Sequence, residues 1–130
     1  MTEAPATVRV LLVDDHELFR EAARAVVCAT PGFETVAETP CGIEALDLAD
    51  RLRPDVVLLD LDMTEPDGIE TARRMITRES PPLVVLVSLE LDHPEQASRL
   101  PAGPVAFVRK QDLRPLVLSE VWERWVTRAG

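Results

Sequence analysis

The sequence predicts an α/β fold in which a doubly wound, five-stranded parallel sheet carries helices on both faces. Three observations support this prediction. Short apolar runs alternate with amphipathic segments along the chain. Two of these runs, 8–13 and 55–60, are almost continuously apolar, as is typical of strands that are buried on both faces. Connections between parallel strands are right-handed, so repeated alternation winds the helices onto both sides of one sheet.

The first half of the chain contains two expected strands, each followed by an expected helix. VRVLLV (8–13) is too short and too rich in valine and leucine for a helix, so we expect a buried strand. The segment 15–30 repeats its apolar residues at helical spacing until a Pro-Gly pair interrupts it. FETVAE (33–38) alternates in the way expected of a strand nearer the edge of the sheet. Residues 42–52 again carry apolar residues at helical spacing.

The middle of the chain contains two further expected strands. DVVLLD (55–60) and PLVVLVS (82–88) are the second and third strands that we expect to be fully buried. Between them, Asp67 is suited to cap the start of a helix over 68–78, whose apolar residues recur on one face. This order continues the alternation of strand and helix.

The end of the chain is expected to hold a short helix around 94–100, a last strand at 105–109 and a C-terminal helix that starts at Asp112. The C-terminal helix has two adjacent apolar rows, Val117, Val121 and Trp125 in one and Leu118, Trp122 and Val126 in the other. A core-facing stripe about 100° wide is normal, and two rows exceed it. Either the helix has a broad buried face, or the second row is an exposed interface for a partner.

Composition excludes several classes of function. Acidic residues outnumber basic ones 23 to 14, giving a formal net charge of −9, which opposes binding to a phosphate backbone. The N-terminus has no apolar signal segment, and no apolar run approaches membrane-spanning length. We therefore expect a cytoplasmic protein that binds neither nucleic acid nor membrane directly, with a flexible N-terminus (1–7) and one folded domain (8–128). Cys28 and Cys41 are expected to be reduced, buried and inert.

Polar residues stand at the carboxyl ends of four of the expected strands. In a doubly wound sheet the functional site lies outside these ends, near the point where the strand order reverses. The residues that this rule selects are Asp14, Asp15, Asp60, Asp62, Ser88 and Lys110. Converging carboxylates repel one another unless a cation lies among them, and such oxygen ligands suit Mg²⁺. Because a hydroxyl and a lysine can bind phosphoryl oxygens, the set predicts phosphoryl transfer to a nucleophilic carboxylate.

The chain resembles the receiver domain of two-component response regulators in four segments: VRVLLVDDHELFREAARAVV, DVVLLDLDMTEPDGIE, VVLVS and AFVRK. The first segment is most similar to the subfamily whose members often carry a C-terminal helix-turn-helix. The resemblance covers residues 8 to about 127, and the aspartate pair, the central aspartate, the hydroxyl and the lysine come in the family's order. It implies a receiver domain over 8–128 with the flavodoxin-like strand order 2-1-3-4-5.

The resemblance implies that Asp60 accepts the phosphoryl group. It also implies a Mg²⁺ ion bound by Asp15, by Asp60 and by the backbone carbonyl of Asp62, with Asp14 acting through a water molecule. The side chain of Asp62 is expected to lie beside the site without a role of its own.

Three further roles follow from the resemblance: Ser88 would be the switch hydroxyl, Lys110 the contact to the phosphoryl group and Phe107 the switch aromatic. The implied partners are a sensor histidine kinase and then a downstream protein or a second copy of the chain. Such a domain phosphorylates and dephosphorylates itself and is not a turnover enzyme. His16 and His93 are expected to be solvated residues at helix starts.

Two other interpretations stay open at this point. In the first, DLDMT opens a haloacid-dehalogenase-type phosphatase, with Asp60 as nucleophile and Asp62 as general acid, although the order of the motifs and the short chain count against it. In the second, the domain is a pseudo-receiver, an interaction module that does not use the phosphate. Thr64 replaces the family's usual proline, Leu89 replaces a small residue and could narrow access to the site, and Gln111 follows the lysine where proline or aspartate is common.

Overall fold

The chain folds around a parallel β-sheet. The computed structural model describes residues 6–63, 67–90, 95 and 98–129. Within these residues, five strands pair in the order β2-β1-β3-β4-β5. The strands are β1 (Val8–Val13), β2 (Phe33–Thr39), β3 (Val56–Asp60), β4 (Leu83–Ser88) and β5 (Val105–Arg109). The predicted strands and the strand order are therefore confirmed.

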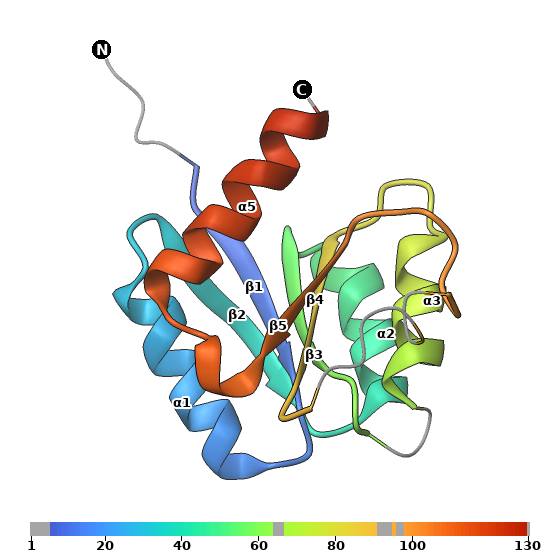
Figure 1. Ribbon diagram of the computed structural model, residues 1–130, viewed down its shortest axis with the longest axis horizontal. Coiled ribbons are helices and arrows are strands. Elements are labelled where there is room, and N and C mark those ends of the chain that lie inside the picture. The colour runs from blue at the N-terminus through green and yellow to red at the C-terminus, as the bar shows by residue number, and fades with distance from the viewer. Residues whose placement is uncertain (1–5, 64–66, 91–94, 96–97, 130) are drawn as a thin grey trace.

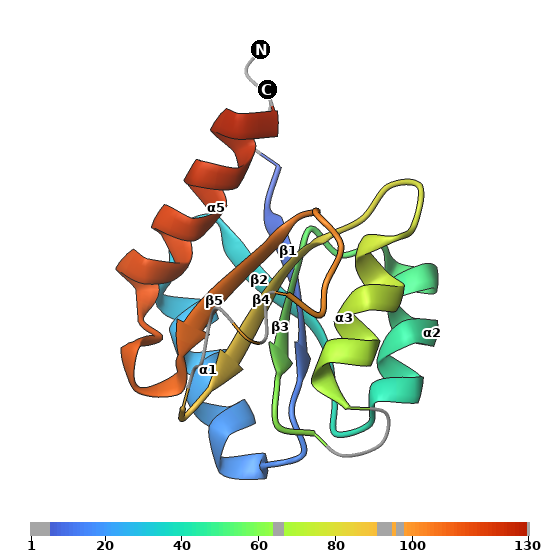
Figure 2. The same cartoon turned by 45° about the vertical axis from the view of Figure 1, so that its right-hand side comes forward.

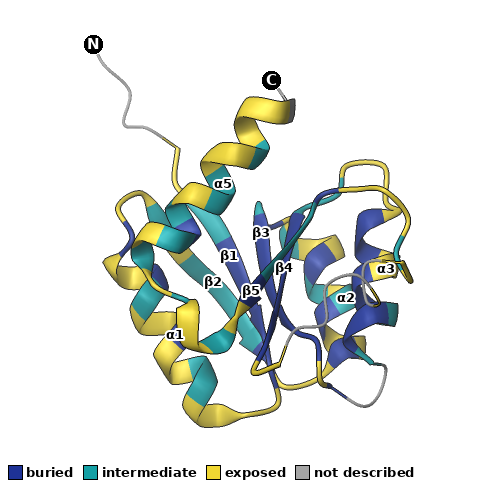
Figure 3. Ribbon diagram, in the orientation of Figure 1, coloured by how far each residue is buried: buried dark blue, intermediate teal, exposed yellow. Residues whose placement is uncertain are grey.

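The central strands owe their burial to helices on both sides of the sheet. Every residue of β3 and of β4 is buried, as their continuous apolar sequences predict. The edge strands β2 and β5 are only partly buried. Figure 3 shows this gradient, with the buried strands at the centre of the fold and exposed residues on the outer helices.

Helices cover both faces of the sheet (Figures 1 and 2). One face carries α1 (Glu17–Ala29) and α5 (Pro115–Ala129), and the other carries α2 (Gly42–Leu52) and α3 (Gly68–Ile76). Alternate residues of each strand serve the two faces. In β1, for example, Val10 and Leu12 pack toward α1 and α5, whereas Leu11 and Val13 pack toward α2 and α3. The doubly wound architecture is thus built from two apolar cores that share one sheet.

Two helix boundaries differ from the sequence prediction. The helix α3 ends at Ile76, two residues before the predicted end. The C-terminal helix α5 starts at Pro115 instead of Asp112, because Lys110–Asp112 form a separate 3₁₀ turn, η1. Proline is well suited to a first helical position, where its missing N–H is not needed. Of the short helix expected around 94–100, residue 95 is helical and residues 98–100 form a turn and a bend, whereas residues 94, 96 and 97 lie outside the described residues.

The apolar rows of α5 correct one prediction about an interface. Leu118 belongs to the row that the sequence allows as an exposed interface, but only 1% of it is accessible and it packs in the core shared with α1. Trp122 is half-buried against the same core, and only Val126 is clearly exposed, at 46%. The row that contains Leu118 therefore faces the sheet, and the broad buried face is the better interpretation of this helix.

Two smaller observations complete the fold. Cys28 and Cys41 are both exposed, so the prediction of buried thiols was wrong, although both thiols are free. None of the helices in the described part of the chain is both long and apolar enough to cross a membrane.

Candidate functional site

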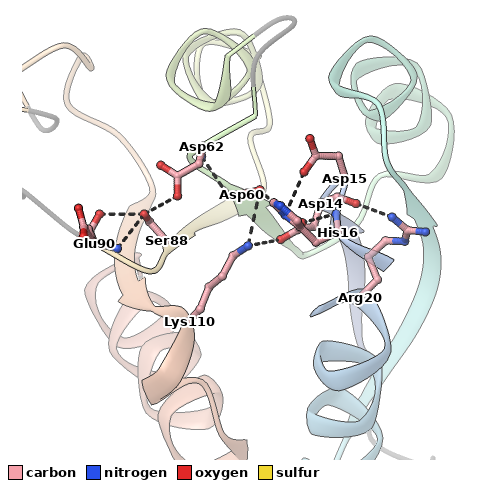
Figure 4. Close-up of polar contacts among 9 residues, drawn as sticks. All are labelled: Asp14, Asp15, His16, Arg20, Asp60, Asp62, Ser88, Glu90 and Lys110. Carbon is pink, nitrogen blue, oxygen red and sulfur yellow. Dashed lines mark hydrogen bonds and ion pairs between the residues drawn. The ribbon is translucent and has the colours of Figure 1, made fainter. Parts of the chain in front are cut away.

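The carboxyl ends of four strands bring the predicted site residues to one edge of the sheet (Figure 4). Asp14 follows β1, while Asp60 and Ser88 are the last residues of β3 and β4. Lys110 comes directly after β5. Its Nζ lies 2.9 Å from Asp14 Oδ2 and 3.6 Å from Asp60 Oδ2. The topology therefore joins residues that are far apart in the sequence, as the strand-end rule predicts.

Asp60 is buried and its two carboxylate oxygens have different surroundings. Its Oδ1 accepts a hydrogen bond from the amide of Asp62 at 2.9 Å. Its Oδ2 is buried and accepts no hydrogen bond from any described residue. Burial raises the pKa of Asp60, and the nearby charge of Asp14 raises it further, whereas the Asp62 amide and Lys110 act in the opposite direction. One oxygen of the carboxylate is thus hydrogen-bonded to the backbone, and the other accepts no hydrogen bond from the described residues.

Lys110 is the main positive charge inside the site. Only 8% of its side chain is exposed, and its ammonium lies 4.5 Å from the centre of the Phe19 ring. The aromatic face and the carboxylate of Asp14 together hold the ammonium near the free oxygen of Asp60. A compact ammonium in this position suits contact with a phosphoryl oxygen.

His16 lies among the carboxylates, where the sequence prediction did not expect it. Its Nδ1 is 3.0 Å from Asp14 Oδ1, 3.1 Å from Asp15 Oδ1 and 3.6 Å from Asp60 Oδ2. It is the N-cap residue of α1, so the prediction of a helix-start position was right. Its proximity to the site could have been inferred from its place directly after two residues of the acidic edge.

Asp62 does more than lie beside the site. Ser88 Oγ lies 2.7 Å from Asp62 Oδ2 and 2.8 Å from the carbonyl oxygen of Glu90. A serine hydroxyl has one proton, so it serves one of these acceptors at a time. The Ser88 hydroxyl also accepts a hydrogen bond from the Glu90 amide at 3.2 Å. The expectation of an Asp62 side chain without a role is therefore corrected, because it holds the predicted switch hydroxyl.

Arg20 is a second residue that the sequence prediction missed. Its Nη1 donates a hydrogen bond to the backbone oxygen of Asp14 at 2.6 Å, and its Nε lies 3.4 Å from Glu38 Oε1. This arginine therefore ties the loop after β1 to the end of β2. Its helical position, one turn after the cap of α1, gave no sign of this role.

The remaining predicted residues surround this centre. Phe107 is half-buried on β5 and packs against the core on the side of α2 and α3. Leu89 is 62% exposed, and its carbonyl oxygen accepts a hydrogen bond from Gln111 Nε2 at 3.3 Å. Thr64 and His93 lie outside the described residues.

The donor set of the acidic edge fits a divalent cation. One ligand atom from each of Asp14, Asp15, His16 and Asp60 lies within 4.8 Å of the others. Asp60 Oδ2 is a buried anionic oxygen without a hydrogen bond, which a cation would satisfy. Oxygen ligands of this kind bind Mg²⁺ readily, and the carboxylates alone satisfy that chemistry.

The fold and the site define a flavodoxin-like α/β domain with a cluster of carboxylates, a histidine and a lysine at the carboxyl edge of the sheet. Comparison with known families gives the particular class. The family model described as the response regulator receiver domain matches residues 10–119. The chain therefore belongs to the response regulator receiver domains of two-component systems, as the resemblance predicted, and it is not a haloacid-dehalogenase-type phosphatase.

Relatives and solved structures agree with this assignment. The chain is 31% identical over 104 residues to the transcriptional regulatory protein DegU of Brevibacillus brevis, covering 80% of this chain and 44% of that protein. It is 37% identical over 105 residues to a protein-glutamate methylesterase/protein-glutamine glutaminase of Alkalilimnicola ehrlichii, covering 80% and 27%. The response regulator domain of Thermotoga maritima CheB matches with a TM-score of 0.76 at 25% identity, covering 92% of this chain and 96% of that one.

The chain spans less than half the length of both relatives. In the methylesterase, the matching part is the receiver part of a longer protein. The activity named for that enzyme therefore belongs to the longer protein, and what the relatives share with this chain is the receiver domain.

Proposed function

We propose that this receiver domain accepts a phosphoryl group on Asp60 in a Mg²⁺-dependent reaction. The observation that carries the proposal is the free, buried Oδ2 of Asp60, 3.6 Å from the Lys110 ammonium. A carboxylate oxygen that has no hydrogen bond and faces a positive charge is suited to attack an electrophilic phosphorus. The family of the chain supports the same assignment.

The reaction is an in-line phosphoryl transfer. A bond forms between a carboxylate oxygen of Asp60 and phosphorus, while the bond from phosphorus to the donor atom breaks. The donor atom keeps the electron pair of the broken bond. In a sensor histidine kinase the donor atom is an imidazole nitrogen, which then takes up a proton from solvent. In a small phosphodonor the donor atom is an acyl oxygen.

The residues around Asp60 supply positioning and charge. Asp14, Asp15, Asp60 and the backbone carbonyl of Asp62 would hold Mg²⁺, which neutralises the carboxylates and the phosphoryl oxygens when bound. Lys110, whose ammonium lies 3.6 Å from Asp60 Oδ2, would neutralise negative charge on the phosphoryl oxygens. The amide of Asp62 keeps the other carboxylate oxygen in place.

The switch would begin at Ser88. Its hydroxyl is hydrogen-bonded within the site, to Asp62 or to the Glu90 carbonyl. A phosphoryl group on Asp60 offers a stronger, anionic acceptor, so the hydroxyl would turn toward it and release Asp62. This change gives the two states different contacts, which is the condition for a shift in population. Phe107 on the neighbouring strand would follow as the switch aromatic.

The proposal extends to partners and place. We infer that this protein is cytoplasmic and that a sensor histidine kinase donates the phosphoryl group. A downstream protein or a second copy of the chain would then bind the switched surface. The folded unit would be the receiver domain at 8–128. The net charge of −9 disfavours direct binding of nucleic acid by this chain.

Intact mass after incubation with acetyl phosphate or phosphoramidate and Mg²⁺ tests the function. We expect the mass of one phosphoryl group to be added to the wild type and to Asp47→Asn, which changes an exposed aspartate of α2 that pairs with Arg51. We expect no addition in Asp60→Asn or in the presence of a chelator. Equal labelling of Asp60→Asn would overturn the assignment. A folded wild type that gains no mass would favour the pseudo-receiver.

A further inference from the structure

The imidazole of His16 occupies an unusual position for a solvated residue. Its Nδ1 lies 3.0–3.6 Å from oxygens of three carboxylates, those of Asp14, Asp15 and Asp60. The rest of its side chain is open to solvent, with 65% of the side chain exposed. One ring nitrogen therefore faces the acidic site (Figure 4).

Several contacts fix the backbone that carries this ring. The amide of His16 donates a hydrogen bond to Asp14 Oδ1 at 2.7 Å. Arg20 binds the backbone oxygen of Asp14 at 2.6 Å, and the carbonyl of His16 accepts the amide of Arg20 at 3.0 Å in the first turn of α1. The imidazole is thus attached to a backbone that several hydrogen bonds restrain, and this favours a defined position for a metal ligand.

We propose that His16 Nδ1 is a direct ligand of the cation in this site and shifts its metal preference away from Mg²⁺ toward Mn²⁺ and Co²⁺. The inference rests on the metal site of the proposed function. In the tautomer that carries its proton on Nε2, the imidazole presents a lone pair at Nδ1, which is the atom that faces the carboxylates. The buried Oδ2 of Asp60, which accepts no hydrogen bond from the described residues and lies 3.6 Å from His16 Nδ1, is an independent sign of a cation at this edge.

The chemistry of the donor set gives the direction of the preference. Mg²⁺ is a hard cation that favours oxygen ligands and retained waters. Imidazole nitrogen binds first-row transition metals better, and divalent cobalt binds a given nitrogen site more tightly than divalent manganese. A site with three carboxylates and one imidazole nitrogen should therefore discriminate against Mg²⁺ more strongly than the same carboxylates alone.

Bound Mn²⁺ provides a direct test of the ligand. The free Mn²⁺ resonance signal gives the Kd, and electron spin-echo modulation detects a directly coordinated ¹⁴N nucleus. We expect nitrogen modulation in the wild type and in His93→Ala, which changes the only other histidine of the chain. We expect the modulation to disappear in His16→Ala and in His16→Asn, which keeps a side chain suited to the helix cap, while Mn²⁺ still binds.

Affinities for the three cations test the preference. The ratio of the Mg²⁺ Kd to the Mn²⁺ Kd should fall by about tenfold in His16→Ala, and the corresponding ratio for Co²⁺ should fall further. Circular dichroism of each variant checks that the fold is kept.

Three results would overturn the inference: bound Mn²⁺ without nitrogen modulation in the wild type, unchanged affinity ratios in His16→Ala, or no Mn²⁺ binding at all. The last result would also remove the metal from the proposed function. Nitrogen modulation in a protein that gains no phosphoryl mass would support His16 as a metal ligand. It would contradict only the proposal that Asp60 accepts a phosphoryl group.

Discussion

At the residue scale, Gly68 connects the geometry of the site to the fold. It is the first residue of α3, and this helix starts against the end of the strand that carries Asp60. Asp67 caps the helix by accepting the amide of Glu70 at 2.7 Å, as the sequence predicts. A Cβ atom at position 68 would lie 2.5 Å from the backbone oxygen of Asp60 and 2.6 Å from Leu61 Cα. Glycine is therefore required here by space.

Substitution of this glycine should damage both stability and the site. Because the atoms that a methyl group would meet are backbone atoms, they cannot rotate away, and Gly68→Ala should cost about 2–3 kcal/mol of unfolding free energy. Phosphorylation of Asp60 should also slow, since the end of β3 has to move. Urea unfolding and intact mass measure the two effects.

Gly103→Ala is the matched control for this prediction. A Cβ atom there would lie 3.3 Å from Ile76 Cδ1, the flexible end of a side chain, so the cost should stay below about 1 kcal/mol. Equal urea midpoints for the two variants would contradict the steric argument.

The predictability of the site differs between residues on strands and residues in loops. Asp60, Ser88 and Lys110 end or follow strands, and an apolar strand pattern followed by a polar residue is enough to place them at one edge. The contacts of His16 and Asp62 depend on how side chains rotate in the loops after β1 and β3. Hydrophobic periodicity carries no information on that rotation, so these contacts needed the structure.

At the element scale, the strands were easier to predict than the faces and ends of the helices. Each buried strand has an unbroken apolar run, and a shift in register would bring polar residues into the core. The two apolar rows of α5 are nearly equivalent in sequence, and the packing of the helix on the sheet decides which one is buried. Leu118 turned out to be the residue at the centre of this contact, with only 1% of it accessible.

A charge contact between α1 and β2 gives a pH-dependent prediction. Arg24 donates two hydrogen bonds to Glu38, at 2.7 and 2.9 Å, and these contacts hold the pKa of Glu38 below its ordinary value of 4.5. A carboxyl whose pKa is lowered by folding stabilises the protein above its unfolded pKa, and this contribution is lost as pH falls through the lowered value. Glu38→Gln should therefore be slightly less stable than wild type near pH 7, and the difference should close below about pH 4.5.

Urea midpoints measured between neutral and acidic pH check this expectation. Glu123→Gln is the control, because Glu123 is exposed on α5 and has no ion pair among the described residues. The difference in urea midpoint between Glu123→Gln and wild type should stay the same over this pH range. If the difference in urea midpoint between Glu38→Gln and wild type grew on acidification, the predicted sign of the pH dependence would be wrong.

At the scale of the whole molecule, the buried carboxylates at the edge of the sheet lower the stability that the apolar cores provide. The two apolar cores supply the favourable burial, and the sheet brings two buried carboxylates together at its edge. Asp14 has Lys110 as a close partner at 2.9 Å, whereas Asp60 has the same ammonium only at 3.6 Å. The raised pKa of Asp60, caused first by burial and then by Asp14, means that folding disfavours its charged form. The negative charge of Asp60 is therefore expected to destabilise the fold when no cation is bound beside it.

Removing the charge of Asp60 should consequently stabilise the metal-free protein. Asp60→Asn keeps the shape of the side chain and the Lys110–Asp14 pair, and it removes a buried negative charge beside Asp14. In chelator, we expect its Tm to exceed that of the wild type, and relief of about 1 kcal/mol corresponds to roughly 4 °C in a domain of this size. Added Mg²⁺ should raise the Tm of the wild type through ligand binding and should raise that of the variant much less, which narrows the gap. Asp47→Asn, on the exposed face of α2, should show neither the gain in chelator nor the loss of the Mg²⁺ response. A lower Tm for Asp60→Asn than for wild type in chelator would mean that attraction to Lys110 outweighs burial and repulsion, and the acidic edge would then be a stabilising feature of the fold.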